Sequence, residues 1–453
     1  MIQGRTINEG SRLEGYFDSM LRIITQIAEA TTELQRISDR THNQQTEGKE
    51  VAVREILKTV QTQGDQALLD YTEKFDQLTL TVDQLRVTGS ELDAAYQQVS
   101  KELIDAIALA KKKIEAFHRQ RQPKSWVEFG KQTVLGKRYT AVDRAGLYVP
   151  GGRASYPSTV LMNAIPATVA GVSRRVMVTP PGPDGKVNSA VLVAAQEAGI
   201  EEIYRVGGAH AIGALAYGTE TIPKVDVITG PGNIYVTLAK KMVYGTVGID
   251  SLAGPSEVLI IADHNANPVY VAADLLAQAE HDPMAAAILL TTEETLAQAV
   301  QKQVEIQLEN HPRRTLTEKA IAHYGVAVVV KSLTEAAKLS NLFAPEHLEL
   351  EVEDPWEMLN LIRHAGAIFM GHSTPEAVGD YLAGPNHTLP TSGAARYASA
   401  LGVETFMKHS SLIEYSHTAL DDVSQAIQTL AQAEGLHSHS ESVRLRMSKQ
   451  YDQ

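Results

Sequence analysis

A glutamine and a histidine stand three residues apart in the stretch DLLAQAEHDP, which runs from Asp274 to Pro283. Residues at this spacing lie on one face of a helix, so Gln278 and His281 can bind one ligand together. Such a pair is either half of a metal site or two solvated side chains at the end of a helix. The spacing leaves both interpretations open, and other segments of the chain must decide between them.

Two later segments contain side chains of the same chemical kind. Asp380 lies in the Gly- and Pro-rich stretch VGDYLAGPNHTLPT, and His439 lies in the polar tail segment EGLHSHSESV. The chain has no cysteine, which excludes disulfides, thiolate ligands and a cysteine nucleophile. Gln278, His281, Asp380 and one tail histidine, His437 or His439, would form a nitrogen and oxygen donor set that suits zinc. An aspartate in a turn is equally often only a turn former, so the pattern alone does not establish a site.

A carboxylate and an imidazole are adjacent in FAPEHLEL, at Glu346 and His347. Two such groups with different pKa values could serve as the acid and the base of a two-step proton transfer. Proline followed by glutamate is also ordinary chemistry for the first turn of a helix. On this pattern alone, the helix cap is the better interpretation.

Two glycine-rich stretches, VGGAHAIGAL and ITGPGNIYVTLAKK, each follow an expected strand and open an expected helix. This context presents free backbone N–H groups and the positive end of a helix to a phosphate. Neither stretch matches the G-x-G-x-x-G fingerprint of dinucleotide-binding folds. A tight strand-to-helix turn explains the glycines equally well.

The elements that must position these residues follow an α/β pattern. The first part of the chain has apolar residues at helical intervals. From about residue 150 to 250, short apolar strands alternate with small-residue helices, and a second alternating set runs from SEVLIIAD to GAIFMG. Alternation of this kind predicts parallel sheets built from βαβ units. We therefore expect an α/β protein with two Rossmann-like parallel-sheet domains and helical segments at the N- and C-terminal ends.

Composition narrows the class of protein. The chain has 453 residues, of which 43% are hydrophobic and 21% charged, as in ordinary soluble globular proteins. A net charge of -13 argues against nonspecific nucleic-acid binding, which needs a basic surface. No apolar run approaches the ~18 residues of a membrane span, and no signal peptide is recognisable. We expect a cytoplasmic protein with neither a nucleic acid nor a membrane as partner.

Seven segments, in this order, resemble the histidinol dehydrogenase family: GLYVPGG, ALAYGTETIPKVDVITGPGNIYV, AGPSEVLIIAD, DLLAQAEHDP, LFAPEHLEL, GDYLAGPNHTLPT and EGLHSH. The resemblance extends over nearly the whole chain. It implies a zinc-dependent enzyme that oxidises L-histidinol to L-histidine with two NAD, in the last reactions of histidine biosynthesis. It also implies a homodimer with shared active sites, because the tail of each subunit completes the site of the other.

The resemblance assigns a role to individual residues. The catalytic pair falls on Glu346 and His347. The zinc ligands, one ion per subunit, fall on Gln278, His281, Asp380 and His439. The substrate contacts fall on Ser256, Gln278, His281, His347, Asp380, Glu434 and His439, and the NAD contacts fall on Tyr148, His210 and Asn233.

One position departs from the family pattern. The family usually has glutamine where this chain has His210, in GGAHAI. A neutral imidazole cannot reproduce both functions of an amide in one tautomer. We expect an altered affinity for NAD rather than a loss of activity.

The expected domain organisation combines the pattern with the resemblance. Residues 1–30 form an N-terminal helical segment, and residues 31–148 with 250–400 form the main α/β domain, which carries the metal and catalytic residues. Residues 149–249 form a second α/β domain that binds NAD. Residues 401–453 form a C-terminal tail, too polar to fold alone, that packs on the partner subunit.

Three other functions are compatible with parts of the pattern. A zinc hydrolase would use the same ligands with Glu346 activating water, but it has no need of the glycine-rich turns. A non-catalytic, metal-stabilised dimer would have no use for Glu346 and His347 together. A paralogue that oxidises another small alcohol remains the nearest alternative, since only Glu434 and the tail motif favour histidinol.

Overall fold

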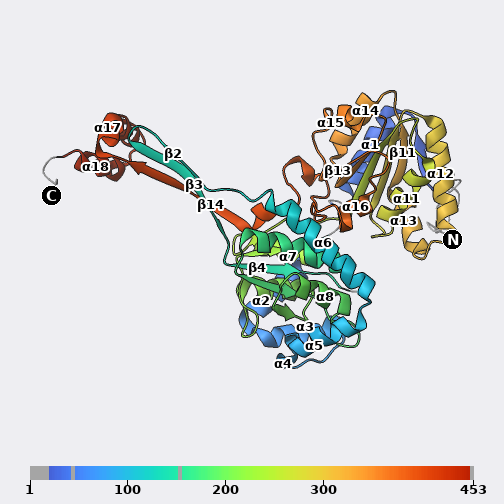
Figure 1. Ribbon diagram of the computed structural model, residues 1–453, viewed down its shortest axis with the longest axis horizontal. Helices are drawn as coiled ribbons and strands as arrows, with labels where there is room; N and C mark the ends of the chain where they lie inside the picture. Colours follow the sequence, from blue (N-terminus) through green and yellow to red (C-terminus); the bar gives the residue numbers. More distant parts are fainter. Residues whose placement is uncertain (1–19, 42–45, 152–155, 449–453) are drawn as a thin grey trace, which may run out of the picture.

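The computed structural model describes residues 20–41, 46–151 and 156–448. These residues form two α/β domains, each built on a parallel sheet, and a projecting arm (Figure 1). The expected α/β class with two parallel-sheet domains is confirmed. Among the described residues, no helix is both long enough and apolar enough to cross a membrane.

The first domain is built on a six-stranded parallel sheet with the order β1-β11-β10-β9-β12-β13. Its strands are β1 (Arg22–Ile24), β9 (Glu257–Ala262), β10 (Ala286–Thr291), β11 (Gly325–Val329), β12 (His347–Glu351) and β13 (Ala367–Met370). Strand residues alternate between two cores, so that Val258 and Ile260 face one side and Leu259 and Ile261 face the other. A sheet buried on both faces needs apolar residues at every position, which explains the continuous run EVLIIA.

Helices cover both faces of this sheet. On one face lie α11 (Pro268–Ala279), α12 (Glu294–Leu308) and α13 (Arg314–Tyr324), and on the other α1 (Ile27–Ser38), α14 (Leu333–Phe343) and α15 (Pro355–Leu359). The short helix α16 (Glu376–Tyr381) follows β13. Because a crossover helix runs back along the sheet, the C-terminal end of α11 arrives at the edge where the strands begin.

The second domain has a five-stranded parallel sheet with the order β6-β5-β4-β7-β8. Its strands are β4 (Arg144–Tyr148), β5 (Arg174–Val178), β6 (Glu202–Tyr204), β7 (Val227–Thr229) and β8 (Gly248–Ile249). One face is covered by α5 (Gly89–Gln98), α6 (Lys101–Arg119), α7 (Pro157–Ala170) and α8 (Ser189–Glu197). The other is covered by α2 (Glu47–Gln63), α3 (Asp65–Asp76), α4 (Val82–Leu85), α9 (Gly208–Tyr217) and α10 (Ile234–Val243).

This packing corrects the expected grouping of residues 31–148 with 250–400. Helices α2 to α6 pack on the second sheet instead, and β4 is the central strand of that sheet. The apolar stripe of each helix predicts that it covers a sheet, but it does not specify which sheet. Of the N-terminal elements that the structure describes, only β1, α1 and η2 (Asp39–Thr41) stay with the first domain.

The two chain ends also differ from expectation. The expected helical segment 1–30 includes β1, an edge strand paired with β11, while residues 1–19 lie outside the described part. The tail begins with the 3₁₀ turn η4 (Val403–Phe406) and the strand β14 (Met407–Tyr415) before its two helices. The expected helical C-terminal segment is present as α17 (His417–Ala433) and α18 (His437–Arg446), and the strand β14 before it was not expected. Strand formation there depends on a partner more than 250 residues away in the chain, which no local pattern reveals.

The arm is a three-stranded antiparallel sheet with the order β14-β3-β2. It comprises β2 (Trp126–Phe129), β3 (Thr133–Ala141) and β14, and it carries α17 (His417–Ala433) and α18 (His437–Arg446) at its tip. Figure 1 shows this tip extending away from both domains, on the opposite side of the molecule from α16.

Candidate active site

His347 stands at the start of β12 and is 4% exposed. Its Nδ1 lies 3.0 Å from the backbone oxygen of Glu257 and 3.0 Å from Nε2 of Gln278. A carbonyl oxygen only accepts, so the contact with Glu257 requires a hydrogen on Nδ1 and leaves Nε2 with a lone pair. Donation by the Gln278 amide would require the opposite tautomer, and the two contacts therefore compete for one ring atom. Burial lowers the pKa of His347 to about 3, which makes the ring neutral near pH 7.

Glu346 is held by a reciprocal pair of hydrogen bonds with Glu257, the first residue of β9. The backbone N–H of Glu257 donates to Oε2 of Glu346 at 3.0 Å, and the backbone N–H of Glu346 donates to Oε2 of Glu257 at 3.3 Å. Burial and the negative charges of Glu257 and Asp380 raise the pKa of Glu346 well above its ordinary value. A carboxyl group tuned upward in this way suits general acid–base chemistry near neutral pH. The predicted helix cap is wrong here, because Glu346 and His347 enter a strand.

Glu257 is itself anchored from the N-terminal part of the chain. Nη1 of Arg40 donates to Oε1 of Glu257 at 3.0 Å, and both side chains are almost completely buried. The backbone N–H of Ser392 donates to the same oxygen at 3.2 Å. Sequence reasoning missed Arg40 and Glu257. The available signal for Glu257 was a glutamate at the start of the otherwise apolar stretch EVLIIA.

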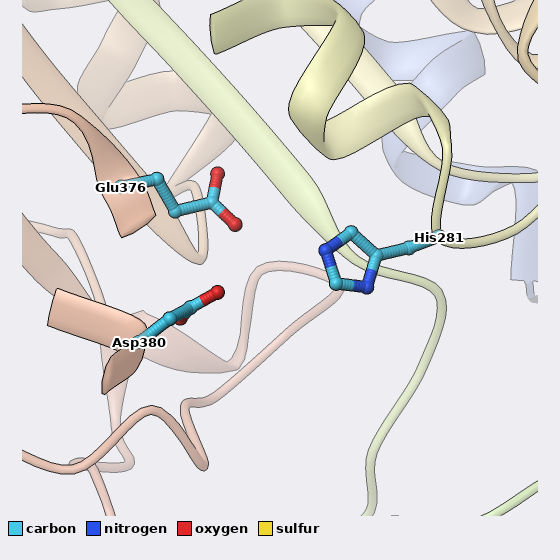
Figure 2. A group of neighbouring side chains, drawn as sticks. All are labelled: His281, Glu376 and Asp380. Atoms are coloured by element: carbon cyan, nitrogen blue, oxygen red, sulfur yellow. The ribbon is translucent and has the colours of Figure 1, made fainter. Parts of the chain in front are cut away.

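Three possible metal ligands converge near His347. One ligand atom each from His281, Glu376 and Asp380 lies within 4.8 Å of the other two. Figure 2 shows His281 approaching from the loop after α11, with both carboxylates approaching from α16 on the opposite side. Oε1 of Glu376 also lies 3.8 Å from Nε2 of His347. The structure thus brings together His281 and Asp380 as the sequence predicted, and it adds Glu376, which lies one helical turn before Asp380.

Gln278 supplies a further oxygen at this place. It is fully buried in the last turn of α11, and its Oε1 has no hydrogen-bond partner in the part of the chain that the structure describes. A buried polar atom left without a partner is costly unless something else satisfies it. Burial raises the pKa of Asp380 to about 6 and lowers the pKa of His281, which favours a neutral imidazole with a lone pair to offer. These residues fit a divalent cation such as zinc, which would satisfy all of them.

His387 is a buried neighbour to which sequence reasoning assigned no role. Its Nε2 has no hydrogen-bond partner among the described residues, and burial lowers its pKa to about 4, to which a positive charge on His281 also contributes. Its position in a Gly- and Pro-rich loop was the available signal.

A second group of acids lies directly behind the first. Glu349 and Glu351 follow His347 at alternate positions of β12, so all three side chains share one face of the sheet. Ligand atoms of Asp274, Glu349 and Glu351 lie within 4.8 Å of one another. Oε1 of Glu349 accepts a hydrogen bond of 2.9 Å from the backbone N–H of Glu376. This bond ties the start of α16, and with it Glu376, to the strand that carries His347.

The remaining predicted substrate and metal residues are not assembled within one chain. Ser256 immediately precedes β9, next to Glu257. Glu434 and His439 are exposed and lie at the tip of the arm, far from α16 (Figure 1).

The predicted NAD residues lie where strands of the second sheet end. Tyr148 ends β4, and its hydroxyl accepts a 3.2 Å hydrogen bond from the backbone N–H of Gly208. Asn233 caps α10, with its Oδ1 accepting from the N–H groups of Tyr235 and Val236 at 3.0 and 3.2 Å. The carboxyl ends of parallel strands, next to helix N-termini, are the usual location of a bound dinucleotide.

His210 lies in the first turn of α9 and is 1% exposed. Its ring centroid lies 5.7 Å from that of Tyr71 and 6.1 Å from that of Phe75. Neither ring nitrogen has a hydrogen-bond partner within the described ranges, and burial lowers the pKa of His210 to about 3. The side chain is thus a neutral imidazole with two unsatisfied polar atoms.

The chain is similar to known proteins over most of its length. A family model described as histidinol dehydrogenase matches residues 39–447. Histidinol dehydrogenase 2 of Trichormus variabilis is 74% identical over 95% of this chain and 100% of its own length. Histidinol dehydrogenase of a Synechococcus species is 72% identical over 94% of this chain and 99% of its own.

A solved structure shows the same similarity in three dimensions. The crystal structure of histidinol dehydrogenase from Elizabethkingia anophelis superposes with a TM-score of 0.90 at 39% identity, covering 95% of this chain and 99% of that one. The chain therefore belongs to the histidinol dehydrogenase family, whose members are NAD- and zinc-dependent oxidoreductases of histidine biosynthesis.

Proposed function

We propose that this enzyme carries L-histidinol through both oxidation steps, to histidinal and then to L-histidine, reducing two NAD at one site. The observation that supports the two-step course is the pairing of Glu346 and His347, which lie in contact but have opposite pKa shifts. Burial favours the neutral form of each group, so one holds a proton while the other can accept one.

The metal would be held by Oε1 of Gln278, by His281, by Asp380 and by His439 of the partner subunit. A bound zinc ion supplies a template that fixes the amino and imidazole nitrogens of the substrate. Glu376 is close enough to His281 and Asp380 to take part in the same site.

In the first step, Nε2 of His347 accepts the hydroxyl proton of histidinol as the carbinol C–H bond delivers hydride to NAD. The backbone oxygen of Glu257 favours this role, because it holds the hydrogen on Nδ1 and leaves Nε2 unprotonated. The buried position of His347 keeps bulk water away from the aldehyde that results.

In the second step, Glu346 in its ionised form removes a proton from the water that adds to the aldehyde carbon. Protonated His347 returns the proton of the first step to the former aldehyde oxygen, which completes the gem-diol and leaves Nε2 unprotonated again. The gem-diol then gives a hydride to a second NAD, and His347 accepts the hydroxyl proton released in that transfer. The hydrogen bond from the Glu257 N–H holds the Glu346 carboxyl group in place during this step.

The test is a count of NADH formed from a limiting, known amount of L-histidinol with zinc and excess NAD. Two NADH per histidinol support the complete sequence. One NADH would show that the aldehyde escapes or stalls and would contradict the role of Glu346. No NADH from a zinc-loaded, NAD-binding enzyme would point to another small alcohol as substrate.

We also propose that two copies of the chain share their active sites through the arm. Large apolar side chains are exposed along it, including Phe129 at 77%, Ile413 at 72% and Leu430 at 65%. Such a surface is typical of an interface between subunits. Packing on a second copy would cover these residues and would bring Glu434 and His439 of the partner subunit to the metal site.

Mixing two inactive variants tests the shared site. In a heterodimer of Asp380→Ala and His439→Ala subunits, one site combines both defects and the other has none. Random reassociation should restore about a quarter of wild-type activity. If each subunit supplied its own His439, the mixture would stay inactive.

A cytoplasmic location belongs to the same proposal, since the substrate and NAD of a biosynthetic enzyme are found there.

A further inference from the structure

A lysine and an aspartate form a buried ion pair in the second domain, away from the catalytic residues. Lys240 lies in the last turn of α10, and Asp250 follows β8. Their side chains are 2% and 3% exposed, and Nζ of Lys240 contacts Oδ1 of Asp250. Lys240 is among the largest fully buried side chains in the described part of the chain. A buried pair of charges contributes little net stability, since desolvation cancels much of the attraction, so its presence calls for another explanation.

Both charged groups bind the backbone of the same residue. Nζ of Lys240 donates to the backbone oxygen of Gly230 at 2.9 Å. Oδ2 of Asp250 accepts from the backbone N–H of Gly230 at 2.8 Å. Hydrogen bonds to charged partners are stronger and more directional than neutral ones. The pair therefore fixes the orientation of this residue from both sides.

Gly230 occupies a position where small displacements matter. Its φ of +111° is in the left-handed region, and a Cβ atom there would lie 2.0 Å from the backbone oxygen of Tyr148. The turn that begins at Gly230 thus lies directly against the end of β4 and leads into Asn233, the cap of α10. Tyr148 and Asn233 are the two residues between which the proposed dinucleotide site is formed.

We propose that the Lys240–Asp250 pair is a positioning device for NAD, which holds the turn from Gly230 to Asn233 in the conformation that receives the dinucleotide. Both side chains are buried and engaged with each other and with Gly230, so they act through the turn. The inference rests on the proposed location of the NAD site. It adds two residues that no motif in the sequence indicated.

The experiment compares four variants with the wild-type enzyme. Lys240→Met keeps the length of the side chain but removes its charge. The double variant Lys240→Met/Asp250→Leu removes both charges, so that no unpaired charge stays buried. Lys241→Met is the matched control. Lys241 is the exposed neighbour of Lys240 in the chain, and within the described residues it forms an ion pair with Glu50 on the surface. Asn233→Ala tests the location of the NAD site independently.

For each protein we would measure the NAD Kd by titration calorimetry, the zinc content, the histidinol KM and the Tm. Lys240→Met should have the lowest Tm, since Asp250 is left buried without its partner. In the double variant, most of the decrease in Tm should be reversed. Its NAD Kd should still be about tenfold or more above the wild-type value, because the hydrogen bonds to Gly230 are lost. Zinc content and histidinol KM should stay at wild-type values throughout.

A double variant whose NAD Kd returns to the wild-type value together with its Tm would overturn the inference, because the pair would then be only structural. An unchanged NAD Kd in Lys240→Met would overturn it as well. If Asn233→Ala weakens NAD binding and the Lys240 variants do not, only this inference fails. If none of them affects NAD, the proposed NAD site is wrong and the inference fails with it.

Discussion

The imidazole Nδ1 of His347 lies 3.0 Å from the backbone oxygen of Glu257, a residue whose own carboxylate accepts a hydrogen bond from the N–H of Glu346. One residue of a neighbouring strand therefore orients both members of the proposed catalytic pair. The register explains this, because β9 and β12 are adjacent and parallel and His347 is paired with Val258. Strand pairing thus places the backbone of Glu257 beside the ring of His347.

Replacement of Glu346 separates the two half-reactions. Glu346→Gln keeps the shape and can still accept from the Glu257 N–H, but it cannot remove a proton from water. We expect the oxidation of histidinal to slow by ~10²–10⁴-fold, with a much smaller effect on the oxidation of histidinol. Single-turnover measurements starting from each substrate check this, with His347→Asn as the comparison that slows both. An equal loss in both halves would contradict the role of Glu346.

The metal site predicts a specific order of zinc loss. His281→Ala and Asp380→Ala should each lose most of the bound zinc, because each removes a ligand atom from the group of three. Glu376→Gln keeps an oxygen at the same place without the charge, and we expect most of the zinc to remain. Metal content after dialysis, together with turnover, is the measurement. Full zinc and full turnover in either of the first two variants would rule out the ligand assignment.

His210→Gln should change the affinity for NAD. The amide would offer a donor and an acceptor where the neutral imidazole now has two unsatisfied nitrogens. Because burial holds the pKa of His210 near 3, the ring is uncharged at ordinary pH. The change in NAD KM should therefore be the same at pH 6 and pH 8. An NAD KM identical to that of the wild-type enzyme would refute the effect.

The raised pKa of Glu351, one of the acids behind the proposed catalytic pair, predicts how the stability of the fold depends on pH. Burial, and then the charge of Asp274, raises the pKa of Glu351 to about 8 in the folded enzyme, above its unfolded value near 4.5. Between these values the folded state binds more protons than the unfolded state, so the stability contributed by protonated Glu351 is full below pH 4.5 and lost as pH rises to 8.

Glu351→Gln removes this dependence, because a glutamine stays neutral. We expect the variant to have a higher Tm than the wild-type enzyme at pH 8.5 and a Tm close to it at pH 5. Melting curves across this range provide the check, with the exposed Glu353→Gln as a control for a general loss of negative charge. A variant whose Tm falls in parallel with the wild type would show that Glu351 does not titrate in this range.

The sequence by itself indicated most of the candidate site residues. Gln278 and His281 share a helix end, and Glu346 and His347 are adjacent, so their proximity is local and visible in the printed residues. Alternating apolar segments also indicated two parallel sheets, because buried strands and their covering helices have distinct periods. The likeness of seven segments to one family assigned the residues that no pattern could assign.

Tertiary structure alone decided which parts meet. Helices α2 to α6 cover the second sheet, β14 pairs with β3 across the whole chain, and Arg40 reaches Glu257 from the N-terminal part. Glu376 joins His281 only because α16 lies opposite the end of α11. Local periodicity states that a face must be buried, but the partner that buries it is chosen by the packing of the complete chain. For the same reason the family resemblance proposed Asp380 and His439 alike as ligands, while the fold places Asp380 near His281 and His439 at the tip of the arm.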